Sequence, residues 1–154
     1  MNFKDEAIDI RLLRESDGEI LASVEPDVFD EDVVESLAAE FLDDPRHHIV
    51  VAIHESRVVG FASGIHYVHP DKPAELFITE TGVAGRYRRQ GIASRLIRKL
   101  LTHARQLGCK QAWVPTETTN QAARALYRSL GGEEDPEPTI VYNFSLDEQK
   151  TASE

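Results

Sequence analysis

The sequence predicts a mixed α/β domain organised around one strand, one basic loop and one helix between Ala74 and Leu107. Two observations support this fold class. Strand-like and helix-like segments alternate along the chain, and 41% of the 154 residues are hydrophobic, which suffices for one core that buries about two thirds of the unfolded surface. We therefore expect a single domain over residues 1–146 and a disordered tail over 147–154.

The N-terminal third is expected to hold one strand and two helices. Residues 8–13 alternate apolar and polar side chains, as in a half-buried strand. Ser16 and Glu19 have the spacing of a capping box and predict that a helix begins there. The chain from Asp30 to the break at Pro45 predicts a second helix, with the aspartate as its cap.

The remaining elements alternate between strands and helices. Strands are expected over 48–54 and 58–67, joined by a short turn at Glu55-Ser56-Arg57. The other expected elements are a central strand at 76–83, a helix at 92–107 that Gly108 ends, a strand at 111–114, a helix at 121–130 and a last strand at 140–144.

The loop between the central strand and its helix is basic and contains a glycine, Gly91. The first turn of a helix leaves backbone N–H groups unpaired and carries a partial positive charge, so this arrangement binds anions. The loop lacks the Gly-Lys-Ser/Thr ending of a P-loop and the GxGxxG of a dinucleotide-binding turn.

Two motifs resemble those of a known family. Arg88, Gly91 and Ala93 form an Arg-x-x-Gly-x-Ala pattern that resembles the pyrophosphate loop of the GNAT N-acetyltransferases, which use acetyl-CoA. The segment from Asn120 to Gly131 resembles the Asn-x-x-Ala-x-x-Leu-Tyr-x-x-x-Gly helix of the same family. The resemblance extends over about residues 10–144.

The resemblance implies a central, mixed, twisted sheet with helices on both faces. In that fold the strands before Gly82 and after Lys110 splay apart, and the pantetheine arm of acetyl-CoA enters the gap. The residues that it assigns to cofactor binding are Thr81, Gly82, Val83, Arg88, Arg89, Gln90, Gly91, Ile92, Ala93 and Asn120.

Two residues are candidates for catalysis. The resemblance places Glu80 where a carboxylate can help to deprotonate the acceptor amine, and Tyr127 where a phenol can protonate the departing CoA sulfur. The simpler readings are an outward-facing glutamate on a strand and a core tyrosine on an amphipathic helix. Asn120 can likewise be explained as a helix cap.

The closest resemblance within the family is to the gentamicin 3-N-acetyltransferases. Those enzymes carry an aspartate where this chain has Glu80, so the carboxylate is displaced by about one methylene. We expect an aminoglycoside acceptor, with a polyamine, another small amine or a protein amine as alternatives. Candidate acceptor-binding carboxylates are Glu80, Glu117, Asp30 and Glu134.

The charge distribution supports a polycationic acceptor independently of the resemblance. The chain has a formal net charge of −10, and twelve carboxylates but no lysine or arginine lie between Glu15 and Pro45. From Thr81 to Thr116 the sequence instead holds eight basic residues and no carboxylate. Residues 15–45, which we call the acidic arm, would attract a cationic amine. The basic segment at 81–116 would suit a phosphate-bearing cofactor.

Other classes of protein are less consistent with the sequence. No apolar run reaches about 20 residues and the N-terminus lacks a signal pattern, so we expect a cytoplasmic protein without membrane association. The net charge argues against nucleic-acid binding. His47-His48 and His66-x-x-His69 do not make a metal site, and Cys109 is assigned to the core. A catalytically silent CoA-sensing or protein-binding module, and a homodimer, stay open.

Overall fold

The computed structural model describes residues 7–147, which form an open five-stranded sheet in the order β1-β2-β3-β4-β5. The pairs β1–β2, β2–β3 and β3–β4 are antiparallel, whereas β5 runs parallel to β4. The strands are β1 (Asp9–Leu12), β2 (His47–His54), β3 (Arg57–Tyr67), β4 (Glu75–Val83) and β5 (Gln111–Trp113).

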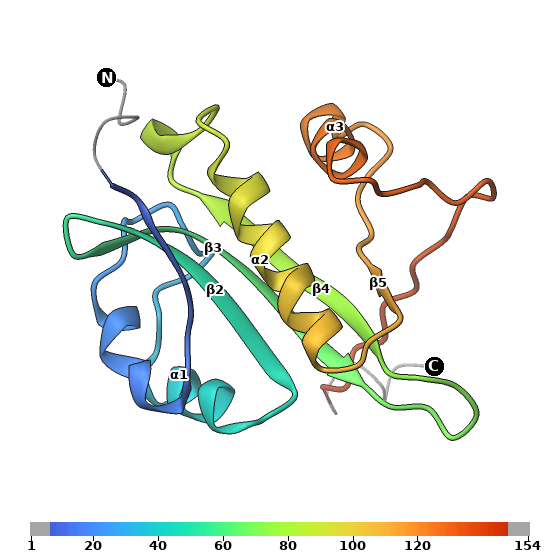
Figure 1. Cartoon of the computed structure of the whole chain (residues 1–154), viewed down its shortest axis with the longest axis horizontal. Coiled ribbons are helices and arrows are strands. Elements are labelled where there is room, and N and C mark those ends of the chain that lie inside the picture. Colours follow the sequence, from blue (N-terminus) through green and yellow to red (C-terminus); the bar gives the residue numbers. More distant parts are fainter. Residues whose placement is uncertain (1–6, 148–154) are drawn as a thin grey trace.

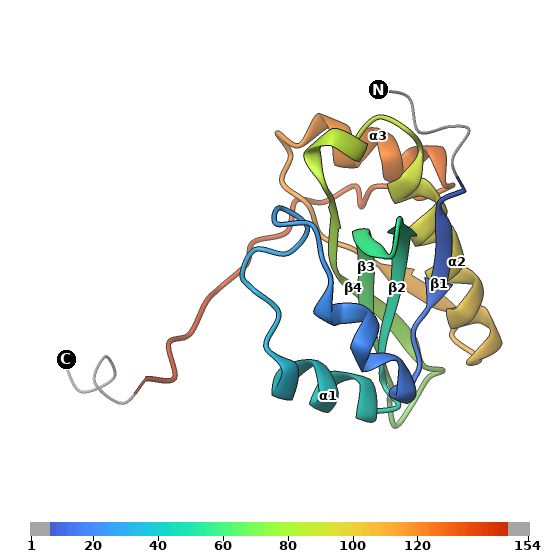
Figure 2. The same ribbon diagram turned by 90° about the vertical axis from the view of Figure 1, so that its left-hand side faces the viewer.

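Helices cover both faces of this sheet, as Figure 2 shows, so the expected mixed α/β class is confirmed. Helix α2 lies along one face, and α1 lies with η2 on the other (Figures 1 and 2). The helical segments are the 3₁₀ segment η2 (Glu15–Ala22), α1 (Glu35–Asp43), the 3₁₀ turn η3 (Gly85–Tyr87), α2 (Ile92–Gln106) and α3 (Gln121–Ser129). Between residues 7 and 147, none of these helices is long and apolar enough to cross a membrane.

The core lies between α2 and the central strands. Five residues of α2 are buried at helical spacing, and each large one contributes about 1.5–3 kcal/mol through burial. They are Ile92, Leu96, Ile97, Leu100 and Ala104. Gly108 follows with φ +87°, a left-handed conformation that ends the helix at low cost. This element therefore follows the sequence prediction almost residue for residue.

Strands β4 and β5 separate after a short stretch of pairing. Their hydrogen-bonded register covers only Glu75–Phe77 of β4 against Gln111–Trp113 of β5, although β4 continues to Val83. The far part of β4 remains paired with β3 on its other edge. The gap between β4 and β5 is the splayed strand pair that the resemblance implies, and Figure 1 shows the chain running from β5 across to α3.

The first two helices differ from the prediction. The segment expected to begin with a Ser16–Glu19 capping box is a 3₁₀ helix whose N-cap is Arg14, and the side chain of Asp17 accepts the Arg14 N–H at 2.8 Å. The second helix begins at Glu35 rather than near Asp30, because Val34 is still extended. Competing local hydrogen bonds from aspartate side chains explain the first difference.

The expected last strand at 140–144 is wrong: the structure assigns no strand there. Its large side chains are solvent-exposed, Tyr142 at 78% and Phe144 at 84%. The segment has strand propensity, but no described strand lies beside it to supply a ladder of hydrogen bonds. Of the tail expected at 147–154, all but Asp147 lies outside the described residues.

Candidate active site

The basic loop between β4 and α2 has a compact and partly strained backbone. It passes through η3 and reaches Arg89, which has φ +61°, and Gly91, which has φ +77°. The hydrogen bond from the Arg88 Nε to the Val83 carbonyl, 3.0 Å long, ties the loop back to the end of β4. A left-handed arginine costs of the order of 1 kcal/mol, and strain of this kind is typical of ligand-binding turns.

The N-terminus of α2 is open. Gly91 is its N-cap and provides no side-chain hydrogen bond, so the first N–H groups of the helix have no side-chain acceptor. A Cβ atom added to Gly91 would meet no heavy atom within 4 Å. The space in front of this helix end can therefore admit a phosphate group against the backbone.

The cationic side chains around the loop differ in whether their charge is compensated by a carboxylate. Arg86 forms an ion pair with Glu25 at 2.8 Å, and Arg95 donates to the Ile8 carbonyl at 3.1 Å. Neither Arg88 nor Arg89 has an ion pair within residues 7–147, and Arg88 donates only to the Val83 carbonyl, so both loop cations can contribute charge to an anion site.

The gap beside β4 brings together two of the predicted residues, Thr81 of β4 and Tyr127 of α3. The Thr81 hydroxyl oxygen is buried and has no hydrogen-bond partner in the described part of the chain. It lies close enough to the Tyr127 phenol to influence the pKa of that phenol. A buried, unsatisfied hydroxyl in a gap is what a polar ligand would complete.

The Tyr127 phenol is held in its protonated form. Burial raises its pKa, and the neighbouring Thr81 hydroxyl offsets only part of that effect. The side chain is half-buried between the core and the gap. Position and protonation state thus both suit a proton donor to a group that enters between β4 and β5.

Glu80 lies next to a β-bulge. In the β3–β4 register, Ser63 pairs with Glu80 and Gly64 pairs with Ile78, so Thr79 is the extra residue. The Thr79 and Ser63 hydroxyl oxygens are 2.8 Å apart and fix the bulge. Bulges change the direction of neighbouring side chains, and here the Glu80 side chain is solvent-exposed.

Gly82 has a packing role that the sequence did not reveal. A Cβ atom at this position would lie 2.4 Å from the Val28 carbonyl oxygen, so only glycine allows the chain near Val28 to cross β4. The neighbouring Phe29 ring stacks on Phe61 of β3, with 4.1 Å between the ring centroids. The segment after η2 is therefore packed directly onto β3 and onto β4, the strand that borders the gap.

Asn120 caps α3, since its Oδ1 accepts the Ala123 N–H at 3.0 Å. The Glu134 carboxylate binds the guanidinium groups of Arg124 at 2.7 Å and Arg128 at 2.8 Å. These ion pairs compensate its charge, while its side chain stays 48% exposed, so a contact with the acceptor remains a prediction. Glu117 and Asp30 are exposed.

The acidic arm borders a groove of about 990 Å³ between η2 and α1. Five carboxylates line it, over an apolar floor that includes Leu21 and Val33. They are Glu15, Glu19, Glu35, Glu40 and Asp43. The lining does not include Glu80 or Glu117, so the structure gathers much of the negative charge on the arm itself rather than around Glu80.

The histidines form a chain of contacts between the sheet and α2. His48 of β2 is buried, its Nε2 lying 2.7 Å from the Nδ1 of His66 and its Nδ1 lying 3.1 Å from the Nε2 of His103. Burial, then the neighbouring His103 and His66, lowers the pKa of His48 to about 4. Cys109 is buried, as expected, and burial raises the pKa of its thiol.

The structure adds residues that the sequence did not indicate. Glu25 and Asp27 contact the start of the basic loop, and His54 lies 2.7 Å from the buried Tyr87 hydroxyl. Between 33 and 61 positions separate these partners along the chain. No local pattern could have indicated them.

A model of the Acetyltransferase (GNAT) family matches residues 11–131. An uncharacterized N-acetyltransferase of Mycobacterium tuberculosis (strain ATCC 25618 / H37Rv) is 33% identical over 93 residues, which are 60% of this chain and 57% of that protein. The match therefore spans little more than half of that relative. The N-alpha-acetyltransferase RimI of the same organism is 34% identical over 133 residues, 85% of this chain and 82% of that protein.

Solved structures share the fold. An aminoglycoside acetyltransferase from an uncultured soil metagenomic sample, in complex with sisomicin, has a TM-score of 0.78 at 18% identity and covers 94% of this chain and 99% of its own. The aminoglycoside N-acetyltransferase AAC(6')-Iy in complex with CoA has a TM-score of 0.71 at 22% identity, covering 90% and 95%. At these identities the likeness concerns the fold.

Proposed function

This chain belongs to the GNAT family of acetyltransferases, and from that premise we propose that it transfers the acetyl group of acetyl-CoA to a primary amine of a cationic acceptor. The observation that carries the proposal is the junction of three features: the splayed edge of β4, the open N-terminus of α2 and the Tyr127 phenol beside Thr81.

These features fit the two ends of acetyl-CoA. The N–H groups at the start of α2, with Arg89, provide positive potential for the pyrophosphate. Beyond Phe77, the edge of β4 that faces β5 has no strand partner in the described chain. Backbone groups of Thr81 to Val83 would pair there with the pantetheine amides, and Thr81 Oγ1 would gain a partner.

The chemistry moves protons at the acceptor nitrogen and at the sulfur. Acetyl-CoA, when bound, supplies an activated thioester carbonyl. The Glu80 carboxylate accepts a proton from the acceptor ammonium, directly or through water, so that the neutral nitrogen can attack. The Tyr127 hydroxyl, which burial keeps protonated, donates to the sulfur as the C–S bond breaks, and CoA leaves as the thiol. The nitrogen then gives up its second proton, which restores the Tyr127 phenol directly or through water, and no enzyme nucleophile is needed.

The acidic arm supports a polycationic acceptor of the aminoglycoside or polyamine class. Its groove presents five carboxylates, Asp30 is exposed nearby in sequence, and a cation is steered by such a field even before contact. Among aminoglycosides, we retain gentamicin and acetylation at its 3-amino group as the first reaction to test, because the motifs resemble those of the gentamicin 3-N-acetyltransferases.

A second candidate acceptor is the N-terminal amine of a protein. It is favoured by the 34% identity with RimI over 85% of this chain. The two candidates make different demands: a peptide acceptor needs only its terminal amine, whereas an aminoglycoside or polyamine presents several positive charges at once.

The test is acetyl-CoA turnover with gentamicin, spermidine and a peptide with a free N-terminus, followed as released thiol. For a polycationic acceptor, kcat/KM should fall as ionic strength rises, since exposed charges are screened over about 8–10 Å near physiological salt. A peptide acetylated fastest, without salt dependence, would instead favour the protein acceptor. Thiol release with none of these amines would favour a CoA-binding module without turnover.

The Glu80→Gln variant tests the proposed base with the same assay. It preserves size and removes the charge, so turnover should fall and the low-pH side of the kcat/KM profile should flatten. Asp71→Asn is the matched control, an exposed carboxylate in the loop between β3 and β4 that has no assigned role in the site. Wild-type turnover and pH profile in the Glu80→Gln enzyme would remove Glu80 from the mechanism.

A further inference from the structure

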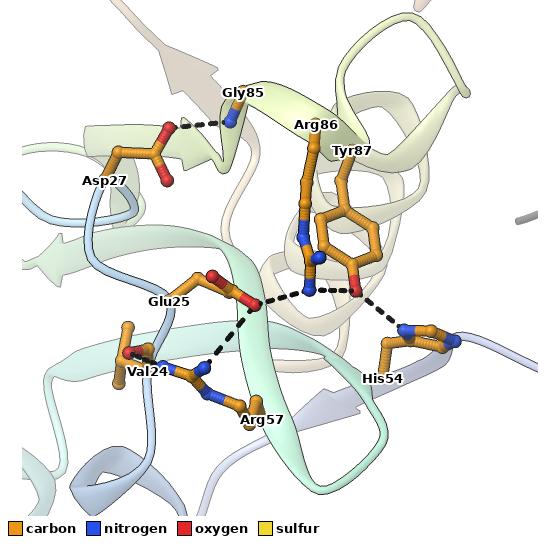
Figure 3. A network of polar contacts seen from close by, with 8 residues as sticks. All are labelled: Val24, Glu25, Asp27, His54, Arg57, Gly85, Arg86 and Tyr87. Carbon is orange, nitrogen blue, oxygen red and sulfur yellow. Dashed lines mark hydrogen bonds and ion pairs between the residues drawn. The ribbon is translucent and has the colours of Figure 1, made fainter. Parts of the chain in front are cut away.

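Two carboxylates of the acidic arm hold the start of the basic loop, as Figure 3 shows. Asp27 Oδ2 accepts the Gly85 N–H at 2.7 Å. Glu25 Oε1 accepts from the Arg86 guanidinium at 2.8 Å. The contacts join positions about 60 residues apart in sequence, and they engage both of the first two residues of η3.

The arm is itself fixed to the sheet at this point. The Glu25 N–H donates to the Val58 carbonyl and the Val58 N–H donates to the Ser23 carbonyl, both at 2.9 Å. Val24 therefore forms a parallel bridge with Val58 of β3. Arg57 adds a hydrogen bond to the Val24 carbonyl at 2.9 Å. The carboxylates thus project from an ordered strand-like segment rather than from a free loop.

The Glu25–Arg86 pair is partly shielded from water. The Glu25 side chain is 12% exposed, whereas that of Arg86 is 61% exposed. Arg86 also lies 3.3 Å from the Tyr87 hydroxyl, which contacts His54 from the opposite side (Figure 3). The turn is therefore held between the arm and β2. Arg57 Nη1 lies 3.7 Å from the same Glu25 oxygen, so Glu25 binds two guanidinium groups (Figure 3).

This arrangement is unexpected beside a pyrophosphate site. A carboxylate near the loop lowers the local positive potential, and Glu25 neutralises one of the loop's arginines. The pair gives no advantage to anion binding by charge alone. Its effect is geometric: it fixes the turn from which Arg88, Arg89 and Gly91 continue to the start of α2.

We propose that Glu25 and Asp27 are positioning residues that couple the acidic arm to the basic loop. This inference rests on the proposed acetyltransferase function. The same segment continues through Asp30 into the exposed carboxylates, so an acceptor bound there stabilises the arm position that holds the loop. Binding of CoA and of the acceptor then reinforce each other, and by linkage each raises the affinity for the other by the same factor.

The test measures the Kd of CoA by calorimetry for the wild type, Asp27→Ala and Asp27→Asn. We expect Asp27→Ala to weaken CoA binding about tenfold, or about 1.4 kcal/mol. Asp27→Asn should restore most of the affinity, because its amide oxygen can still accept the Gly85 N–H. Asp71→Ala, which removes an exposed carboxylate outside both the acidic arm and the loop, is the matched control.

The coupling is measured by repeating each titration with saturating spermidine or gentamicin, whichever the wild type acetylates. In the wild type, the acceptor should lower the Kd of CoA at least about fivefold. In Asp27→Ala, the ratio of the Kd of CoA without the acceptor to the Kd with it should approach one. A general loss of stability does not produce this effect. Glu25→Gln, which keeps the side-chain size, provides a second variant if Asp27→Ala does not fold.

The outcomes separate the two proposals. Failure of the wild type to bind CoA contradicts the proposed function. Normal CoA binding by the wild type together with an unchanged Kd in folded Asp27→Ala and Glu25→Gln overturns the positioning role alone. If a variant binds CoA more weakly but the acceptor still lowers its Kd of CoA by the same factor as in the wild type, the coupling is refuted. Glu25 and Asp27 would then have only a structural role in holding the loop.

Discussion

Tyr127 shows how one residue can satisfy both packing and chemistry. Its ring packs against the edge of the hydrophobic core, while its hydroxyl lies near Thr81 at the gap beside β4. Burial, which raises the pKa, keeps the phenol protonated at neutral pH. A core role and a catalytic role therefore do not exclude each other.

Replacement of Tyr127 by phenylalanine removes the hydroxyl and keeps the ring. We expect kcat to fall by about 10²-fold with little change in either KM, since a general acid acts mainly in the transition state. Steady-state kinetics of the purified variant measure this. Tyr142→Phe, at an exposed position, is the control, and a wild-type kcat for Tyr127→Phe would return the residue to a purely structural role.

Gly91 and Gly108 form a matched pair for testing the loop. Both have positive φ, +77° and +87°, and neither has an atom within 4 Å of an added Cβ. Alanine at either position should cost about 1 kcal/mol of stability through backbone strain. Only Gly91→Ala, and more strongly Gly91→Val, should also raise the Kd of CoA; equal CoA affinity of the Gly91 and Gly108 variants would remove Gly91 from the site.

The caps at Gly91 and Asn120 were predictable from local motifs, whereas contacts that the tertiary structure creates were not. Gly91 and Asn120 are marked by turn and cap chemistry that depends on a few neighbours in sequence. Glu134 shows the limit: its acidity suggested a cationic ligand, but the partners are Arg124 and Arg128 of its own chain. The contact of Glu25 with Arg86 could be predicted only by knowing which segment of the chain lies beside the end of β4.

Among the elements, β4 carries most of the site because it is paired differently along its two edges. One edge follows β3 with a bulge at Thr79, and the other leaves β5 after Phe77. The strong periodicity of α2 and the turn residues Glu55 and Ser56, with φ of 49° and 63°, made those elements predictable. The boundaries of η2 and α1 were not: at η2 the Asp17 side chain competes for a backbone hydrogen bond, and before α1 the chain is still extended at Val34.

The histidine contacts between β2, β3 and α2 give the fold a dependence on pH. The pKa of His48 is lowered to about 4 when folded, against about 6.5 when unfolded. As pH falls through this window the unfolded chain gains a proton that the folded chain does not, so stability falls below about pH 6.5. His66, His103 and His47 repel the added charge, and Asp44 partly offsets this.

Chemical denaturation at a series of pH values tests this linkage. Between pH 6.5 and 4 the wild type should lose up to about 3 kcal/mol of unfolding free energy through His48. His48→Gln cannot titrate and should show a smaller slope across the same window. Parallel curves for the two proteins would mean that His48 is protonated equally in the folded and unfolded states.

At the scale of the whole molecule, charge and apolar surface are unevenly placed. The basic residues gather in the loop and α2, the carboxylates in the arm, and a run of exposed large side chains lies near the C-terminal end of the described chain. Figure 2 shows this C-terminal segment leaving the body of the domain. Its side chains therefore contribute little to the stability of the described fold.

Substitution of Tyr142 and Phe144 by serine should change the unfolding free energy by no more than about 0.5 kcal/mol, as expected for exposed sites. Leu100→Ala, in the core face of α2, should cost about 2–5 kcal/mol. Thermal and denaturant unfolding measure the free energy of unfolding of the serine variant and of Leu100→Ala. A loss from the serine variant as large as that of Leu100→Ala would show that the segment packs against the domain in solution.

The single cysteine has a practical consequence for biophysical work. Cys109 is 7% exposed and its thiol has a raised pKa, so it reacts slowly with maleimides and iodoacetamides. One cysteine introduced at an exposed site such as Leu37 would therefore take up a fluorophore almost alone, without prior removal of the native residue. Distances from that dye to a labelled CoA would then report the movement of the arm.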